Sequence, residues 1–381
     1  MSNEAPFSYQ LVKALKKHID VTVVCPLPWF PNIKALSFMT KWYEMAQVPE
    51  FHCFDGIDVY YPKYFMLPKI SRSIQPKLQN NSSKRLIEKI HKNNAINLVN
   101  AQWMYPDGVT AINITRSMKL PTILTALGCD INDEIKYPEQ KSMIISAINN
   151  ASCVTGVSKA LVEKMKLLGT QQNCFEYIPN GVDTTGFSPE KYARHELSKK
   201  LGLNENEKYL LYVGRLSDEK GISYLLSAIL KIKKSGNLTF KTIIVGDGDK
   251  YNDVVSYIKE NKLDNDIILA GLQPHEKIPM WMSCVDMLVL PSIREGMPNV
   301  ILEAHAMGLP TIATDVGGIP DMISDGVNGF IIQKQNSDLL ADAISNAFSR
   351  SWDRDRIRDH VKERTWDKIA LEYLRVYNKS M

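Results

Sequence analysis

Two glutamates flank a predicted turn between a strand and a helix in PSIREGMPNVILEAHAMGLP (291–310). Glu295 comes directly after an apolar strand pattern, and Glu303 falls on the second turn of a helix that we expect to begin near Pro298. A carboxylate in that place can accept hydrogen bonds from both hydroxyls of a ribose. Gly296 lets the backbone approach a ligand closely, and the amides of the first helical turn point toward an anion. The spacing predicts a site for a phosphate-bearing, hydroxyl-rich ligand; the alternative is a pair of solvated glutamates.

A second pair of charges, Arg215 and Lys220, lies in GRLSDEKG (214–221), again immediately after a strand pattern. The guanidinium of arginine offers a planar fork for phosphate oxygens, and the lysine ammonium adds a compact charge. Together these cations can neutralise a diphosphate without a metal ion. The alternative is two surface cations on a turn, and we favour function because the segment accompanies the glutamate pair.

Two further turns add weaker signals. VGDGD (245–249) is a strand followed by a glycine-rich turn, which suits close packing or the approach of a ligand. In AGLQPHEK (270–277) the backbone of residues 271–273 lies where a nucleotide base could form hydrogen bonds. His275, in the same segment, is expected to begin a helix rather than to act as a catalyst.

Short β-branched runs that alternate with amphipathic helical patterns position these segments. In the first half, strands are predicted at 21–25, 96–101, 121–127, 153–157 and 175–179, with helices at 107–118, 139–149 and 159–168. In the second half, strands are predicted at 208–214, 240–246, 266–271, 286–291, 310–315 and 329–333. Alternating strands and helices imply parallel sheets that are covered on both faces. Two such series predict an α/β protein with two doubly wound, Rossmann-like domains.

The domain boundary is predicted within IPNGVDTTGFSPE (178–190), which collects turn-forming residues between two periodic regions. We expect an N-terminal domain at 1–183, a C-terminal domain at 184–351, and helices at 352–381 that return to the first domain. Apolar positions in this tail are Leu371, Leu374 and Val376.

The chain opens on a helix pattern formed by Phe7, Leu11 and Leu15. A doubly wound domain normally begins with a strand and a glycine-rich turn ahead of that helix. We therefore expect the first strand of the N-terminal domain to be missing; the alternative is a variant domain that opens on a helix.

The composition is that of a globular protein: 381 residues, 44% hydrophobic and 23% charged, with a net charge of +4. It excludes disordered, collagen-like and disulfide-scaffold proteins, and the charge does not indicate nucleic-acid binding. The six cysteines form no CxxC pair and have no zinc spacing, so we expect reduced core cysteines. The start lacks a signal-peptide pattern and no apolar run approaches the roughly 18 residues of a membrane span, which predicts a cytoplasmic or peripheral membrane protein.

The second half resembles the donor domain of the family-4 glycosyltransferases, which have the GT-B fold of two Rossmann-like domains facing a cleft. The family's glutamate pair matches Glu295 and Glu303. Its GR-L-x-x-x-KG segment matches Gly214, Arg215, Leu216, Lys220 and Gly221, and a later glycine-rich segment matches Gly308, Pro310, Thr311, Ala313, Gly317, Gly318 and Asp321. The resemblance is specific over residues 175–335 and looser through LPWFP (27–31), AQWMYPDG (101–108) and LGCDIN (127–132). LPWFP and YPDG are similar to members that build bacterial surface polysaccharides.

The resemblance implies transfer of a hexose from a UDP- or GDP-linked donor, with retention of anomeric configuration and without a metal or other cofactor. It implies that Arg215 and Lys220 stabilise the leaving diphosphate, that Glu303 holds the ribose, and that Glu295 holds hydroxyls of the donor sugar. The catalytic set so implied is Glu295, Arg215, Lys220 and Asp130. The donor-binding set is Gly214, Gly246, Asp247, Gly271, Leu272, Gly296, Met297, Pro298, Asn299, Val300 and Glu303.

The chain departs from the family in two places. The glycine-rich turn that follows the first strand is absent. In LGCD, Leu127 stands where many members have a histidine. Asp130 remains and is expected to line the acceptor side, with a helix N-cap as the alternative.

The expected acceptor is a glycan or lipid-linked glycan. Residues 60–92 join aromatic and apolar residues to a basic stretch, which suits an anionic membrane surface; the alternative is a solvated basic face. The cations are Lys63, Lys69, Arg72, Lys77, Lys84, Arg85, Lys89 and Lys92. No nucleic-acid recognition motif accompanies them. Two other functions stay open at this point: a sugar-nucleotide epimerase, and a non-catalytic nucleotide-binding module.

Overall fold

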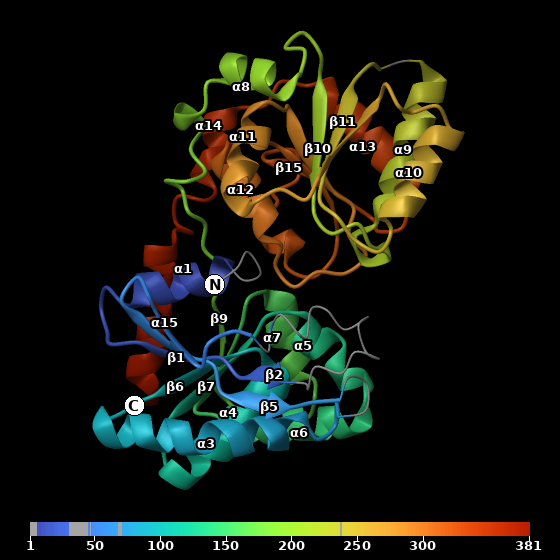
Figure 1. Cartoon of the computed structure of the whole chain (residues 1–381). Coiled ribbons are helices and arrows are strands. Elements are labelled where there is room, and N and C mark those ends of the chain that lie inside the picture. Colours follow the sequence, from blue (N-terminus) through green and yellow to red (C-terminus); the bar gives the residue numbers. More distant parts are fainter. Residues whose placement is uncertain (1–5, 30–44, 46, 68–70, 237) are drawn as a thin grey trace. The chain divides into compact units, whose positions relative to one another are not determined.

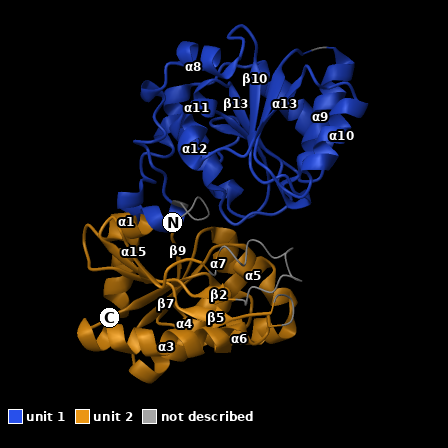
Figure 2. Cartoon of the chain, viewed as in Figure 1, with its two compact units in different colours: residues 1–10, 180–369 blue, residues 11–179, 370–381 orange. Residues whose placement is uncertain are grey.

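The computed structural model describes residues 6–29, 45, 47–67, 71–236 and 238–381. The chain divides into two compact units (Figure 2): unit 1 comprises residues 1–10 and 180–369, and unit 2 comprises residues 11–179 and 370–381. The sequence predicts domain changes after residues 183 and 351, whereas the chain changes unit after Pro179 and after Ile369. Residues 352–369 therefore belong to unit 1.

Unit 1 is built on a six-stranded parallel sheet with the strand order β12-β11-β10-β13-β14-β15 (Figure 1). Its strands are β10 (Tyr209–Val213), β11 (Lys241–Val245), β12 (Ile267–Gly271), β13 (Met287–Leu290), β14 (Thr311–Thr314) and β15 (Gly329–Ile332). Leu210 and Leu211 point to opposite faces, and both are fully buried. Burial on both faces explains why these strands appear as continuous apolar runs, and all six predicted strands are confirmed.

Helices cover both faces of this sheet. They are α8 (Arg194–Leu201), α9 (Ile222–Ser235), α10 (Tyr251–Glu260), α11 (Ile278–Ser283), α12 (Asn299–Ala306), α13 (Ser337–Phe348) and α14 (Arg354–Asp359). In Figure 1, α9, α10 and α13 lie on one side of the sheet, and α11 and α12 lie on the other. Leu225 and Ile229 of α9 pack with Leu210 and Tyr212 of β10 in a buried cluster. Each such leucine or isoleucine stabilises the fold by roughly 1.5–3 kcal/mol.

Unit 2 contains three sheets. A parallel sheet joins β6 (Val99–Gln102), β7 (Thr122–Ala126), β8 (Cys153–Gly156) and β9 (Phe175–Tyr177) in chain order. A second sheet has the order β1 (Thr22–Val24), β4 (Ile57–Tyr60) and β3 (Phe51–Phe54), and β2 (Leu27–Trp29) pairs with β5 (Lys63–Phe65). The five strands predicted for this half are confirmed, while β2 to β5 were not predicted. The expectation that the first strand of this domain is missing stays a prediction.

The helices of unit 2 include α3 (Gln75–Asn93), α4 (Val109–Met118), α5 (Cys129–Asn132), α6 (Pro138–Asn150) and α7 (Lys159–Lys166). Two helices cross the boundary between the units along the chain, α1 (Pro6–Leu15) and α15 (Trp366–Ser380). The predicted apolar position Leu371 on α15 is wrong, because its side chain is 53% exposed. Tyr373, Val376 and Tyr377 form the buried face instead, and Nδ2 of Asn100 donates a 2.6 Å hydrogen bond to the hydroxyl of Tyr377.

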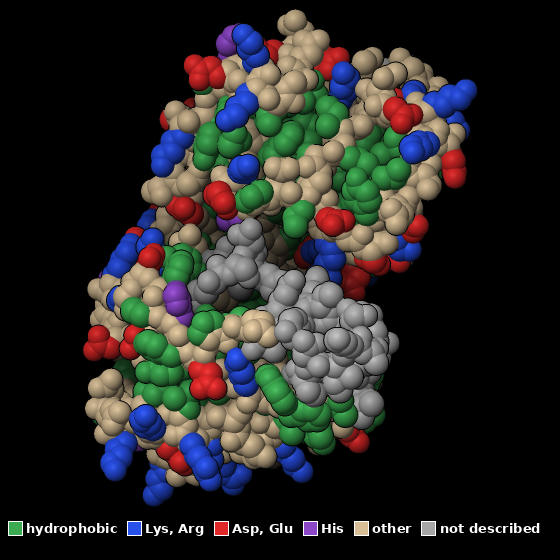
Figure 3. All heavy atoms as spheres, viewed as in Figure 1, with side chains coloured by type: hydrophobic (Ala, Val, Ile, Leu, Met, Phe, Trp, Pro, Cys, Tyr) green, Lys and Arg blue, Asp and Glu red, His purple; other side chains and the backbone are tan. Residues whose placement is uncertain are grey.

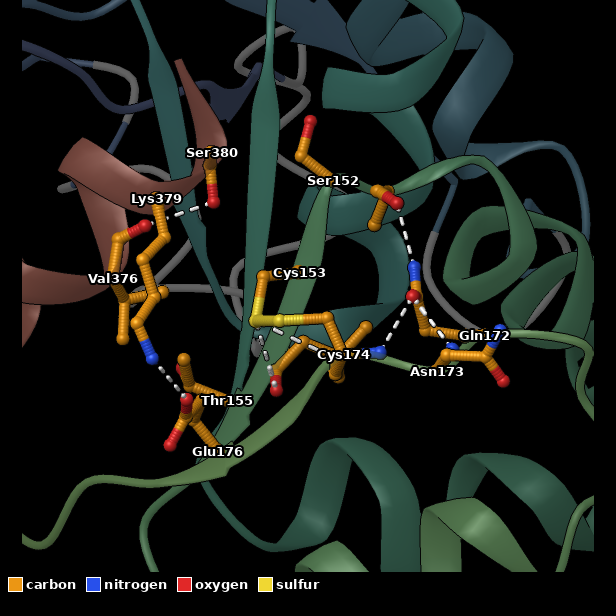
Figure 4. Close-up of a disulfide and its surroundings, with 12 residues drawn as sticks. Ser152, Cys153, Thr155, Gln172, Asn173, Cys174, Glu176, Val376, Lys379 and Ser380 are labelled. Atoms are coloured by element: carbon orange, nitrogen blue, oxygen red, sulfur yellow. Dashed lines mark hydrogen bonds and ion pairs between the residues drawn. A yellow bond between two sulfur atoms is a disulfide. The ribbon is translucent and has the colours of Figure 1, made fainter.

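The expectation of six reduced core cysteines is wrong. Cys153, the first residue of β8, and Cys174, which precedes β9, form a disulfide (Figure 4). The strands are parallel with Val154 opposite Phe175, so the two cysteines are direct neighbours with Cα atoms 4.8 Å apart. The other four are Cys25, Cys53 and Cys129, which are exposed, and Cys284, which is buried.

Candidate active site in unit 1

The strand order of unit 1 creates a point where successive loops diverge. The chain runs from β10 outward to β12, returns to β13 beside β10, and then runs outward to β15. Open parallel sheets bind ligands at the carboxyl ends of the strands at such a switch point. GRLSDEKG follows β10, and the loop with Glu295 follows β13. The fold therefore brings the two strongest sequence signals together.

Glycines let these loops pack backbone against backbone. A Cβ on Gly246, whose φ is +143°, would lie 1.9 Å from the carbonyl oxygen of Gly214. A Cβ on Gly317, whose φ is +58°, would lie 2.2 Å from the carbonyl oxygen of Glu295. Gly318 donates a 2.7 Å backbone hydrogen bond to Gly296. Because backbone atoms cannot move aside cheaply, a side chain at Gly246 or Gly317 would displace the loops that carry the site.

Two side chains hold Glu295. Its Oε1 atom lies 2.6 Å from Nζ of Lys220 and accepts a 2.7 Å hydrogen bond from Oγ of Ser292. The side chain of Glu295 is 7% exposed and that of Lys220 is 26% exposed. Because this ion pair is largely shielded from solvent, removing one partner would leave the other charge without compensation. The loop after β10, through Lys220, and the loop after β13, through Glu295, are thus joined by a direct ion pair.

Glu303 has a partner of its own, the imidazole of His275. Its Oε1 atom lies 2.7 Å from Nε2 of His275, at the start of the short 3-10 helix His275–Lys277. His275 therefore begins a helix, as predicted, and also contacts the site. The hydrogen bond to Glu303 raises the pKa of His275, and burial opposes this rise. The pair lines a cavity of about 270 Å³ in unit 1.

The start of α12 supplies backbone donors beside the two glutamates. Pro298 is the N-cap residue with extended backbone, and α12 begins at Asn299. Oδ1 of Asn299 accepts a 2.8 Å hydrogen bond from Nδ2 of Asn180, and Met297 is buried with its sulfur 3.2 Å from the backbone nitrogen of Asn180. Free amides at a helix N-terminus attract anions, so the N–H groups of Met297, Asn299 and Val300 can bind a phosphate, while Pro298 has no N–H to donate.

The remaining predicted donor residues lie on the neighbouring loops. Arg215 and Asp247 are exposed, and the carbonyl of Arg215 accepts a 2.8 Å hydrogen bond from the hydroxyl of Tyr212. Leu272 follows Gly271 at the end of β12 and is 76% exposed. An exposed leucine at this edge offers an apolar surface to a planar ring. In the part of the chain that the structure describes, no cluster of His, Cys, Asp and Glu is arranged to hold a metal ion.

Asp130 is not part of this arrangement. It lies in unit 2, is fully buried, and accepts backbone hydrogen bonds from Met104 at 2.7 Å, Gly128 at 2.6 Å and Leu127 at 3.1 Å. Burial raises its pKa, and the three amides oppose the rise. The expectation that Asp130 lines the acceptor side does not fit its burial. It ties the loop after β6 to the loop after β7.

Sequence reasoning missed two residues that position the site, Ser292 and Asn180. It named His275 but missed the contact of His275 with Glu303. Ser292 could have been suspected, since it directly follows the strand that leads to Glu295. Asn180 and His275 lie far from their partners in sequence, and no spacing rule connects them. Only the fold shows these contacts.

The chain belongs to the family-4 glycosyltransferases. Residues 193–364 match the family described as glycosyl transferases group 1, and residues 7–185 match glycosyltransferase family 4. A relative in Bacillus subtilis, the teichuronic acid biosynthesis glycosyltransferase TuaC, is 31% identical over 90% of this chain and 84% of its own length. A UDP-Gal:alpha-D-GlcNAc-diphosphoundecaprenol alpha-1,3-galactosyltransferase of Escherichia coli is 34% identical over 44% of this chain and 43% of its own length.

Solved structures support the GT-B fold. Sucrose-phosphate synthase from Thermosynechococcus elongatus has a TM-score of 0.76 and 18% identity, over 98% of this chain and 92% of that protein. Anabaena Alr3699/HepE, solved with UDP, has a TM-score of 0.73 and 20% identity, over 99% of this chain and 98% of that protein. The protein is therefore a glycosyltransferase with two Rossmann-like domains. Among the described helices, none has both the length and the apolar character that a membrane crossing requires.

Proposed function

We propose that this glycosyltransferase moves a hexose from a nucleoside diphosphate to a surface glycan, with retention and without a metal ion. The observation that carries the proposal is the pairing of each glutamate with a nitrogen-bearing side chain, Glu295 with the ammonium of Lys220 and Glu303 with the imidazole of His275, beside the start of α12. Two separate carboxylates suit two separate groups of hydroxyls, and the amides between them suit the connecting diphosphate. A sugar nucleotide has this order of groups.

In the proposed mechanism the chain's own cations replace a divalent metal. Lys220 and Arg215 stabilise negative charge as the diphosphate leaves, which is an electrostatic contribution fixed before the reaction. Glu295 orients the donor sugar through its hydroxyls, and Glu303 binds the ribose. Leu272 covers one face of the base. Retention is a part of the proposal that rests on family membership, and the anomeric configuration of the product, read by NMR, tests it.

The acceptor is proposed to be a growing glycan, in lipid-linked form. Support comes from the names of two relatives, one assigned to teichuronic acid and one acting on a diphosphoundecaprenol-linked sugar. The same names favour uridine as the donor base, since the second relative uses UDP-Gal.

Nucleotide binding is the experiment that tests the donor site. At about 100 times the dissociation constant, a ligand of the native state adds about 2.7 kcal/mol of stability. We expect UDP to raise the melting temperature of unit 1 more than GDP, ADP or CDP, equally with and without EDTA. Glu303→Gln should remove most of the shift, because the amide lacks the negative charge and replaces one acceptor oxygen with a donor nitrogen. A wild-type chain that responds to none of the four nucleotides would refute the proposed function.

A basic face on α3 is proposed to bind an anionic membrane. In Figure 3 lysine and arginine side chains gather along the edge of unit 2 that α3 forms. The exposed cations are Lys77, Arg85, Lys89 and Lys92. Arg72 is instead engaged by Glu134 at 2.6 Å, and Lys69 lies outside the described residues. Tyr61, Tyr64 and Met66 of the predicted apolar set are buried, whereas Phe65 is 46% exposed, so electrostatic attraction gives the proposal its main support.

Vesicle binding tests this face. Each lysine or arginine near an anionic surface contributes about 1 kcal/mol. We expect cosedimentation with vesicles that contain phosphatidylglycerol, and its loss when Lys77, Arg85 and Lys89 are changed to glutamate. The matched control reverses three exposed lysines of unit 1, Lys231, Lys234 and Lys259. Equal loss in both variants, or binding to neutral vesicles, would show that α3 is not a specific docking face.

A further inference from the structure

The contact between His275 and Glu303 joins two loops that are distant in sequence. His275 lies after β12, and Glu303 lies on α12, which follows β13. Nε2 and Oε1 are 2.7 Å apart, and the side chain of Glu303 is 13% exposed. Among the described residues, no other hydrogen bond to the Glu303 carboxylate is found, so Oε2 is available to a ligand. A long carboxylate side chain with one bond to a fixed partner has lost most of its rotamer freedom.

The imidazole is itself held in place. The ring of Phe187 lies 5.4 Å from the ring of His275, centroid to centroid, tilted by 54°. His275 is the first residue of its short helix and follows Pro274, whose φ is fixed by its ring. The Phe187 ring and the short helix thus pack around the imidazole that contacts Glu303.

The titratable groups that act most strongly on His275 are acidic. They are Glu303, Glu276 and Asp183, and all three favour the protonated imidazole. Asp183 accepts backbone hydrogen bonds of 3.0 Å from Thr185 and Gly186, so it is fixed on the opposite segment of the cavity. The charged form of His275 makes a stronger hydrogen bond to a carboxylate than the neutral form does.

We infer that His275 is a positioning residue that fixes the carboxylate of Glu303 for the vicinal hydroxyls of the donor's ribose. The inference rests on the proposed function, since it assigns His275 to the same nucleotide site. A carboxylate that binds a diol must present its oxygens in one plane and one orientation. His275 sets that orientation through Oε1 and acts on the ligand only through Glu303.

Nucleotide affinity, measured by calorimetry with UDP, tests the inference. His275→Ala is expected to weaken binding about tenfold, the usual effect of losing a hydrogen bond to a charged group. His275→Gln, whose amide can donate to the same oxygen, should bind within about twofold of wild type. From about pH 6 to about pH 9, wild-type affinity should fall as the imidazole loses its proton, while the glutamine variant lacks this dependence. His195→Ala is the matched control, because His195 also pairs with a glutamate, Glu205 at 2.8 Å, on exposed α8.

A double-mutant cycle separates positioning from a general structural role. In the Glu303→Gln background, His275→Ala should cause no further loss of UDP affinity, since the residue acts through the carboxylate. Additive losses, or a pH dependence that survives in His275→Gln, would overturn the inference. Failure of the proposed function is distinct, because wild-type protein would then bind no nucleotide. Loss on Glu303→Gln with no effect of His275→Ala would preserve the function and refute the positioning role.

Discussion

Changing Lys220 to methionine is expected to lower turnover by about a thousandfold. The size follows from removing one charge that stabilises a leaving group in a site with little solvent. Methionine keeps the length of the side chain, so the change is chiefly one of charge. Turnover is read as release of nucleoside diphosphate from the sugar nucleotide that the binding experiment selects. Retention of more than about a tenth of wild-type turnover would exclude Lys220 as a catalytic residue.

Two controls separate catalysis from stability. Lys220→Met leaves Glu295 with Ser292 as its remaining partner, so the single variant should also melt earlier. Adding Glu295→Gln removes the uncompensated charge, and the double variant should recover stability without recovering turnover. The matched surface control is Lys231→Met, which breaks an exposed pair with Asp338. Exposed pairs contribute about 1 kcal/mol or less, and turnover should not change.

Acid is expected to destabilise unit 1 through His305. This residue lies on α12, two positions after Glu303, and is fully buried. Burial lowers its pKa to about 3, and the positive charges of His360 and Arg364 add to the effect. In the unfolded chain its pKa is about 6.5. Above that pH both states are neutral. As the pH falls from about 6.5 toward 3, the unfolded state takes up a proton that the native state excludes, so stability falls by about 1.4 kcal/mol per pH unit.

The His305→Met variant isolates this contribution, because methionine fills a similar volume and does not titrate. Unfolding by urea should show the two proteins diverging by about 2 kcal/mol between pH 6.5 and 4.5, with the wild type losing more. Asp107, whose pKa burial raises to about 6, acts in the opposite direction but equally in both proteins. Parallel pH profiles for the two proteins would contradict the assignment.

The elements of unit 1 could be predicted because β10, β11, β13 and β14 are buried on both faces, while β12 and β15 are half-buried but still apolar. The run YLLYV of β10 has no polar residue to confuse its period, and glycines mark the turns that follow β10 and β11. The strands β2 to β5 of unit 2 are short and mix exposed with buried positions, and Pro28 lies inside β2. Their pattern therefore resembles that of loops, which explains why they were not predicted.

The residues of the candidate site also fall into two groups, those that could be predicted from local motifs and those that could not. Glu295, Lys220 and Glu303 stand in local motifs, so their types and spacing were enough to propose them. Their partners were not predictable from spacing, because contacts between the loops after different strands depend on strand order. The disulfide has the same origin: Cys153 and Cys174 meet because β8 and β9 are neighbours in register. Asp130 shows the opposite case, since an aspartate in a motif-like loop became a buried acceptor of backbone amides.

The difference in exposure between the cysteine thiols allows the opening of unit 1 to be measured by thiol labelling. Cys25, Cys53 and Cys129 are exposed in unit 2, whereas Cys284, at the end of α11 in unit 1, is 1% exposed. A thiol-reactive dye should therefore label Cys53 and Cys129 in a fast phase and Cys25 more slowly, because burial raises the pKa of the Cys25 thiol to about 11. It should reach Cys284 only during transient opening of unit 1. The slow phase reports how often the donor-binding unit opens. A nucleotide that binds unit 1 is expected to slow the labelling of Cys284. Nucleotide binding can therefore be followed in the wild-type chain without an added probe site.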